Sequence, residues 1–139
     1  MVGERSKILV VDDDPRFGER AVALLRAAGF AASFHRGPLG TLQAVRDSGC
    51  DLVVLDVNMP KIDGVVLLRM IRDALGLGRV RVVLCSDMAP RVLDAIAASA
   101  RAPFVVKSAS PEVFVESIRS VLEKPAVPTP VTPRRIARA

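Results

Sequence analysis

Short and almost entirely apolar runs recur along the chain, separated by longer segments of mixed polarity. A short apolar run bounded by turn residues is typical of a strand that is buried on both faces of a sheet. The chain contains five such runs, at residues 7–11, 30–35, 52–55, 80–85 and 104–106. We therefore expect five buried strands.

The segments between these runs carry apolar residues every three or four positions, the spacing of amphipathic helices. Serine is a common N-cap and proline is favoured at the first helical position, so Ser110 and Pro111 mark the start of the last helix. Five strands that are each followed by a helix predict an α/β fold with a parallel sheet covered on both faces. The other expected helices are at residues 15–28, 38–47, 65–75 and 90–100.

Composition fits one folded domain without disulfides or a structural metal. The chain has 139 residues, 50% of them apolar, which is enough to bury a sizeable core. Cys50 and Cys85 have no His or Cys nearby to complete a zinc site, so we expect two reduced thiols. The chain start lacks the apolar stretch of a signal peptide, and no run is long enough to span a membrane. We therefore expect a cytoplasmic protein with no membrane partner.

The net charge of +5 is concentrated at the C-terminal end. The rest of the chain carries 16 basic and 15 acidic residues, a net charge of +1, which argues against a nucleic-acid interface on the domain itself. Four prolines after Glu123 exclude a regular helix or central strand through most of this part. We predict a folded domain at residues 1–123 and a proline-rich basic tail or linker at 124–139. The basic residues of this tail are Lys124, Arg134, Arg135 and Arg138.

Polar residues gather where the predicted strands end. Asp12 and Asp13 follow the first strand and Asp56 follows the third, while Ser86 and Lys107 follow the fourth and fifth. The carboxyl ends of parallel strands meet at one edge of a sheet, where open α/β folds bind their ligands. Carboxylates gathered there repel one another, and a divalent cation would relieve that repulsion. Oxygen ligands suit Mg2+, so the sequence predicts a magnesium site.

This set of side chains predicts phosphoryl transfer to a carboxylate. A carboxylate can attack a phosphoryl group and form an acyl phosphate while a metal ion and a lysine neutralise the charge. Asp56 is the favoured nucleophile, because it ends the most apolar strand and precedes a loop that contains Pro60. Simpler roles stay open for the others: helix capping for Asp12 and Asp13, a loop hydroxyl for Ser86 and a solvated charge for Lys107.

Three further polar residues are assigned to structure. Asp14 precedes Pro15 and is expected to cap the first helix. Asp63 precedes Gly64 and is expected to be a turn residue. His35, the only histidine, is expected to have a structural or surface role.

The segments ILVVDDDP, LDVNMPKIDG, VVLCS and FVVK carry a family resemblance. Over roughly residues 7–122 the chain resembles the receiver domains of two-component response regulators. The resemblance implies a flavodoxin-like, doubly wound sheet of five parallel strands in the order 2-1-3-4-5, with five helices. It implies Asp56 as the phosphorylated residue. Mg2+ would then be held by Asp13 directly, by Asp12 nearby, by Asp56, and by the backbone carbonyl of Asn58.

The resemblance also implies a switch and its partners. Ser86 would bond the phosphoryl group, Lys107 would be its charge partner, and Phe104 would follow Ser86 inward. That movement would remodel the surface of the fourth helix, fifth strand and fifth helix, for an output domain, a downstream protein or a second copy. The phosphoryl group would come from a sensor histidine kinase, a phosphotransfer protein or a small phosphodonor. Such a domain catalyses only its own phosphorylation and dephosphorylation, and DNA would be a partner only through an output domain outside this sequence.

Two residues depart from the family pattern. Ser108 follows Lys107 where the family often has a proline after a cis bond, and Asp87 stands where a small residue is common. We expect Asp87 to alter the rate of the chemistry, by pairing with Lys107 or by slowing phosphoryl entry. The alternative function is a pseudo-receiver, which has this fold and binds partners without being phosphorylated. Two other classes are disfavoured. A phosphatase with an aspartyl nucleophile would need a second acid where Asn58 stands. A flavodoxin would need a hydroxyl- and glycine-rich loop after the first strand, which this sequence lacks.

Overall fold

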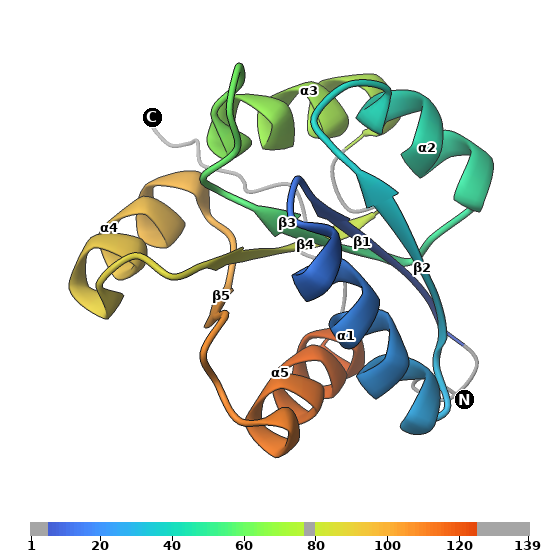
Figure 1. Ribbon diagram of the computed structural model, residues 1–139. Helices are drawn as coiled ribbons and strands as arrows, with labels where there is room; N and C mark the ends of the chain where they lie inside the picture. Colours follow the sequence, from blue (N-terminus) through green and yellow to red (C-terminus); the bar gives the residue numbers. More distant parts are fainter. Residues whose placement is uncertain (1–5, 77–79, 125–139) are drawn as a thin grey trace, which may run out of the picture.

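Figure 1 shows the computed structural model, in which a central sheet carries helices on both sides. The structure describes residues 6–76 and 80–124. The parallel strands lie in the order β2-β1-β3-β4-β5, which confirms the predicted topology. Their bounds are β1 Lys7–Asp12, β2 Ala31–Arg36, β3 Leu52–Asp56, β4 Arg81–Ser86 and β5 Phe104–Val106.

The helices divide between the two faces of the sheet. Helices α1 and α5 pack on one face, and α2, α3 and α4 cover the other (Figure 1). The helices of the described residues are α1 Pro15–Ala27, α2 Thr41–Ser48, α3 Gly64–Leu75, α4 Pro90–Ala100 and α5 Pro111–Glu123. None of them is long and apolar enough to cross a membrane.

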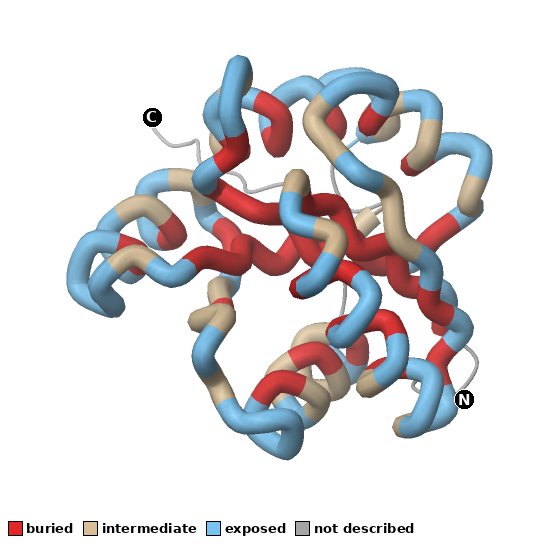
Figure 2. The backbone as a smooth tube through the Cα atoms, viewed as in Figure 1, coloured by how far each residue is buried: buried red, intermediate tan, exposed pale blue. Residues whose placement is uncertain are grey.

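The central strands β1, β3 and β4 are almost entirely apolar and buried because both of their faces are covered, whereas the edge strand β2 is largely exposed. In β1, Ile8 and Val10 point into the cluster beneath α1 and α5, whereas Leu9 and Val11 point into the cluster beneath α2, α3 and α4. Figure 2 shows the resulting band of buried residues along the middle of the sheet. The core therefore holds the strand ends in fixed register, and the site is built on those ends.

Side-chain caps set where several helices begin. Asp14 accepts a hydrogen bond from Arg16 N at 3.0 Å and Ser110 accepts one from Val113 N at 3.2 Å, so both predicted caps are confirmed. Asp63, which was predicted only as a turn residue, caps α3 by accepting from Val65 N at 2.7 Å.

The predicted start of the second helix at Pro38 is wrong. Gly40 has φ 76°, a left-handed conformation that does not belong inside a right-handed helix, and α2 begins only at Thr41. His35 lies in β2 and its ring Nε2 contacts the carbonyl oxygen of Leu39 at 2.7 Å. This contact agrees with the structural role expected for His35.

The predicted tail at residues 124–139 lies outside the described residues, apart from Lys124. Lys124 follows the last turn of α5, and its carbonyl oxygen accepts a hydrogen bond from Arg81 Nη2 at 2.8 Å. The end of α5 is therefore joined to the beginning of β4.

Candidate functional site

Three carboxylates meet at the carboxyl end of the sheet. Asp12 ends β1 and Asp56 ends the neighbouring strand β3, and Asp13 follows directly after β1. One carboxylate oxygen from each residue lies within 4.8 Å of the other two. Asp12 is 0% exposed and Asp56 2% exposed, while Asp13 is half-buried. The expected gathering of carboxylates is therefore present.

Lys107 reaches this group from beyond β5. Its Nζ lies 2.7 Å from Asp12 Oδ2 and 3.5 Å from Asp56 Oδ2. Its backbone N donates to Ser86 O at 2.9 Å, which continues the pairing of β5 with β4. The peptide bond from Lys107 to Ser108 is trans. The serine that replaces the usual proline therefore leaves the ammonium beside both carboxylates.

Asp12 and Asp56 are held in the same way. Oδ1 of Asp12 accepts from Asp14 N at 2.9 Å, and Oδ1 of Asp56 accepts from Asn58 N at 3.1 Å. In both cases Oδ2 faces Lys107. Oδ2 of Asp12 is buried, and its contact with Lys107 is an ion pair without the geometry of a directed hydrogen bond. Each carboxylate is thus fixed through one oxygen and presents the other to the site.

The remaining predicted residues lie on β4 and β5 or directly after β4. Ser86 ends β4, is 1% exposed, and accepts a hydrogen bond from Met88 N at 3.0 Å through its hydroxyl oxygen. Phe104 begins β5 and packs, half-buried, against the cluster beneath α2, α3 and α4. Asp87 is exposed, and the ion pairs that Lys107 makes within the described residues are with Asp12 and Asp56.

Burial and mutual repulsion disturb the ionisation of the site. Burial raises the pKa of Asp56 to about 6, and the charge of Asp12 also raises it, against the opposing effects of the Asn58 N–H and Lys107. Burial by itself lowers the pKa of Lys107, but the contact with Asp12 and the charge of Asp56 outweigh it, so this pKa is raised. The site thus holds a charged ammonium and a carboxylate that is harder to ionise than usual.

This group of residues fits a hard divalent cation. Its donors are carboxylate oxygens, which Mg2+ prefers. The buried Oδ2 of Asp12 accepts no directed hydrogen bond, and three carboxylates stand against one ammonium in this group. Asn58 lies two residues after Asp56 and is exposed, in a β-bridge with Asp63.

Residues 8–119 match the family model of the response regulator receiver domain. The chain belongs to the response regulator receiver domain family. Over 120 residues this receiver domain is 32% identical to the DNA-binding response regulator MtrA of Mycolicibacterium smegmatis, covering 86% of this chain and 52% of MtrA. It is 33% identical to the transcriptional regulatory protein CseB of Streptomyces avermitilis over 124 residues, covering 88% of this chain and 52% of CseB.

The chain thus spans about half the length of these curated relatives. Among solved structures, the receiver domain is similar to the Vibrio cholerae chemotaxis protein CheY4, with a TM-score of 0.76 and 20% identity, covering 85% of this chain and 99% of that one. This likeness shows the fold alone.

Two residues of the receiver domain's site were missed from the sequence. Gly64 lies so close to the backbone of Asp56 and Val57 that a Cβ at this position would clash with both. Phe17 places its ring beneath the Lys107 ammonium, with the centroid 4.9 Å from Nζ. The Asp-Gly pair at 63–64 was read only as a turn and Phe17 only as part of a helix face, because their partners lie far away in the sequence.

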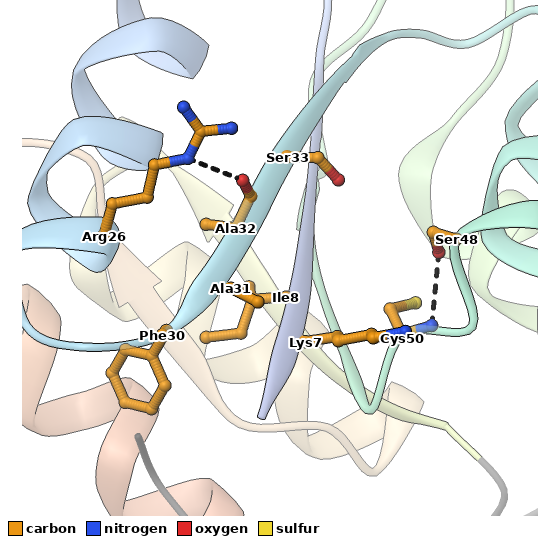
Figure 3. A pocket seen from close by; sticks show the side chains of 9 residues that line it. All are labelled: Lys7, Ile8, Arg26, Phe30, Ala31, Ala32, Ser33, Ser48 and Cys50. Carbon is orange, nitrogen blue, oxygen red and sulfur yellow. Dashed lines mark hydrogen bonds between the residues drawn. The ribbon is translucent and has the colours of Figure 1, made fainter. Parts of the chain in front are cut away.

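A separate cavity of about 330 Å3 lies at the opposite end of the sheet, where β1 and β2 begin (Figure 3). Arg26 Nε donates to the carbonyl of Ala32 at 2.9 Å, and Ser48 Oγ accepts from Cys50 N at 3.2 Å. These polar groups are therefore bound to neighbouring backbone. The acidic end of the sheet, rather than this cavity, carries the converging charged groups.

Proposed function

We propose that this receiver domain accepts a phosphoryl group on Asp56 with Mg2+ bound beside it, and relays the change to an output partner. The observation that carries the proposal is the buried Asp56 carboxylate, with Asp12 and Asp13 close by and the Lys107 ammonium 3.5 Å from its Oδ2. A nucleophile, a metal-binding set and a cation for the phosphoryl oxygens are thus gathered at one point.

The residues divide the chemistry between them. A carboxylate oxygen of Asp56 attacks phosphorus, and the bond from phosphorus to the leaving group breaks with its electron pair on the leaving group. Lys107 attracts the phosphoryl oxygens, and burial strengthens that attraction. Asp12, Asp13, Asp56 and the carbonyl of Asn58 would hold Mg2+. When bound, Mg2+ supplies the remaining charge neutralisation.

The switch uses Ser86 and Phe104. The buried Ser86 hydroxyl accepts from Met88 N, so its own hydrogen is available for a phosphoryl oxygen. Phe104 follows Ser86 inward, and the change reaches the surface of α4, β5 and α5. Val92 on α4 and Val113 on α5 are 43% and 53% exposed, which suits a surface that contacts another protein or a second copy.

The partners follow from the family. A sensor histidine kinase or phosphotransfer protein supplies the phosphoryl group in the cytoplasm, and a small phosphodonor can replace it. MtrA is described as a DNA-binding response regulator and is about twice as long as the matched region. We infer that DNA binding would need an output domain beyond this sequence. The receiver domain itself catalyses only its own phosphorylation and dephosphorylation.

The test is exposure of the protein to acetyl phosphate with Mg2+, followed by intact mass measurement. We expect one phosphoryl adduct, which is lost in Asp56→Asn and when EDTA removes the metal. Asp63→Asn is the matched control, because Asp63 caps α3 outside the carboxylate group and should leave the adduct unchanged. An adduct that persists in Asp56→Asn would contradict the proposal, and no adduct at all would favour a pseudo-receiver.

A further inference from the structure

Three groups with negative potential enclose the Lys107 ammonium. Two are the carboxylates of Asp12 and Asp56, at 2.7 and 3.5 Å from Nζ. The third is the face of the Phe17 ring, whose centroid is 4.9 Å from Nζ, within the range of cation–π attraction. The Lys107 side chain is 15% exposed, so water screens these attractions little.

The local sequence fixes Phe17 beside the site. Asp14 caps α1 directly after the acidic pair, and Pro15 opens the helix. Phe17 therefore falls in the first helical turn, where it is 6% exposed. Its position relative to Asp12 and Asp13 is set by a few residues of capped backbone, not by a long loop.

Helix α5 fixes the orientation of the ring. Phe114 of α5 meets Phe17 edge to face, with ring centroids 6.3 Å apart and an angle of 87° between the planes. This is a preferred geometry for aromatic pairs. Phe114 is itself buried, so the ring of Phe17 contacts both the ammonium and a fixed ring of α5.

We propose that Phe17 is a positioning residue for phosphoryl transfer: its ring holds the Lys107 ammonium between Asp12 and Asp56, and Phe114 holds the ring. The inference rests on the proposed function, because it gives Phe17 a part in the phosphorylation of Asp56. A third carboxylate in place of the ring would add to a negative charge that already exceeds the charge of the ammonium. The ring attracts the ammonium without giving it another anion, and so leaves its charge for the phosphoryl oxygens.

Packing alone is the competing explanation. Phe17 belongs to the apolar cluster between the sheet, α1 and α5, and a phenyl group fills space there whatever lies above it. A packing role depends on the size of the side chain. A cation–π contact depends instead on the electron density of the ring face, which fluorine withdraws while the volume changes little.

The test is graded fluorination of the Phe17 ring, introduced at that position alone. Phe34 is the matched control, since it packs against the same cluster beside Gly18. We expect the rate constant for phosphorylation by acetyl phosphate at saturating Mg2+ to fall with each added fluorine, by about three- to tenfold over the series. The Phe34 series should stay within about twofold of wild type. Phe114→Leu should slow the reaction less than Phe17→Leu does, because it loosens the ring without removing it.

A second readout does not depend on phosphorylation. The ε-methylene protons of Lys107 should show an upfield ring-current shift in the NMR spectrum, and Phe17→Leu should abolish it. If wild type forms the adduct and the fluorinated Phe17 variants form it at the same rate, this inference alone is overturned. Absence of the ring-current shift would overturn it too. No adduct on the wild-type protein would overturn the proposed function, and this inference with it, even if the ring-current shift is present.

Discussion

The two ends of the sheet carry similar charged residues in different environments. At the end where β1 and β2 begin, polar groups bind nearby backbone: Asp51 accepts from Lys7 N at 2.9 Å and Arg26 donates to the carbonyl of Ala32 at 2.9 Å. At the other end, Asp12 and Asp56 are fully buried, face each other, and share one ammonium.

The difference lies in what each arrangement does for stability. Exposed contacts such as the one at Asp51 satisfy a backbone N–H at the start of a strand and cost little desolvation, because the carboxylate stays in contact with water. The carboxylates at the other end are desolvated and repel one another, which the raised pKa of Asp56 reflects. A fold that needed only stability would not place charge there, so this end of the sheet is shaped by binding and chemistry.

Removal of the ammonium should have the largest effect. Lys107→Met leaves Asp12 and Asp56 buried without their cation, and we expect the free energy of unfolding to fall by about 3 kcal/mol without Mg2+. Urea denaturation measures this loss, and saturating Mg2+ should reduce it. Lys7→Met at the opposite end is the control, because Lys7 is exposed and makes its bond to Asp51 through the backbone. Equal losses in the two variants would contradict the comparison.

Removal of the Asp56 carboxylate should have the opposite effect and raise the free energy of unfolding. Because the pKa of Asp56 is raised to about 6, the folded protein binds this proton more tightly than the unfolded chain does. This contribution to stability is therefore complete below the ordinary pKa of about 4 and is lost as pH rises through about 6. Without Mg2+, Asp56→Asn should exceed wild type by about 2 kcal/mol at pH 8 and by little at pH 4.

Urea denaturation of both proteins across this pH range tests the sign. Asp51→Asn is the control, because Asp51 is an exposed carboxylate that accepts a hydrogen bond from Lys7 N. Its substitution should not raise the free energy of unfolding at pH 8. Mg2+ should stabilise wild type more than Asp56→Asn. A wild-type protein that is more stable than Asp56→Asn at pH 8 without metal would contradict the proposed cost of burying the charged Asp56 carboxylate beside Asp12.

The smallest expected difference between the two ends of the sheet is in the reactivity of the thiols of Cys50 and Cys85. Burial raises the pKa of Cys50, and burial raises that of Cys85 far above its ordinary value. Cys50 is 6% exposed beside the cavity of Figure 3, whereas Cys85 is 0% exposed and pairs in register with Asp56. Iodoacetamide at pH 8 should therefore modify Cys50 slowly and Cys85 more slowly still, as peptide mass mapping would show. Faster modification of Cys85 would contradict this order.

The sequence was sufficient for the elements that depend on short-range patterns. Apolar runs predicted the strands, and the residues at their ends predicted which side chains would meet, because parallel strands end at the same edge. Capping chemistry located the starts of α1 and α5. It failed for α2, where Pro38 suggested a start that the left-handed Gly40 delays to Thr41.

What the sequence could not supply was contact between distant residues whose types are ordinary. Phe17 looks like any core residue of an amphipathic helix, and only the fold brings Lys107 over its ring. Gly64 looks like a turn glycine, and its close approach to Asp56 depends on how α3 packs against the end of β3. The pairing of Lys107 with Asp12, more closely than with Asp56, likewise depends on tertiary geometry.

The most direct test of the central claim is to map the phosphoryl group after reaction with acetyl phosphate and Mg2+. Borohydride reduces an acyl phosphate on aspartate to homoserine, which peptide sequencing by mass spectrometry locates. We predict homoserine at Asp56 alone. Homoserine at Asp12, Asp13 or Asp87, or none in protein that binds Mg2+, would contradict the account.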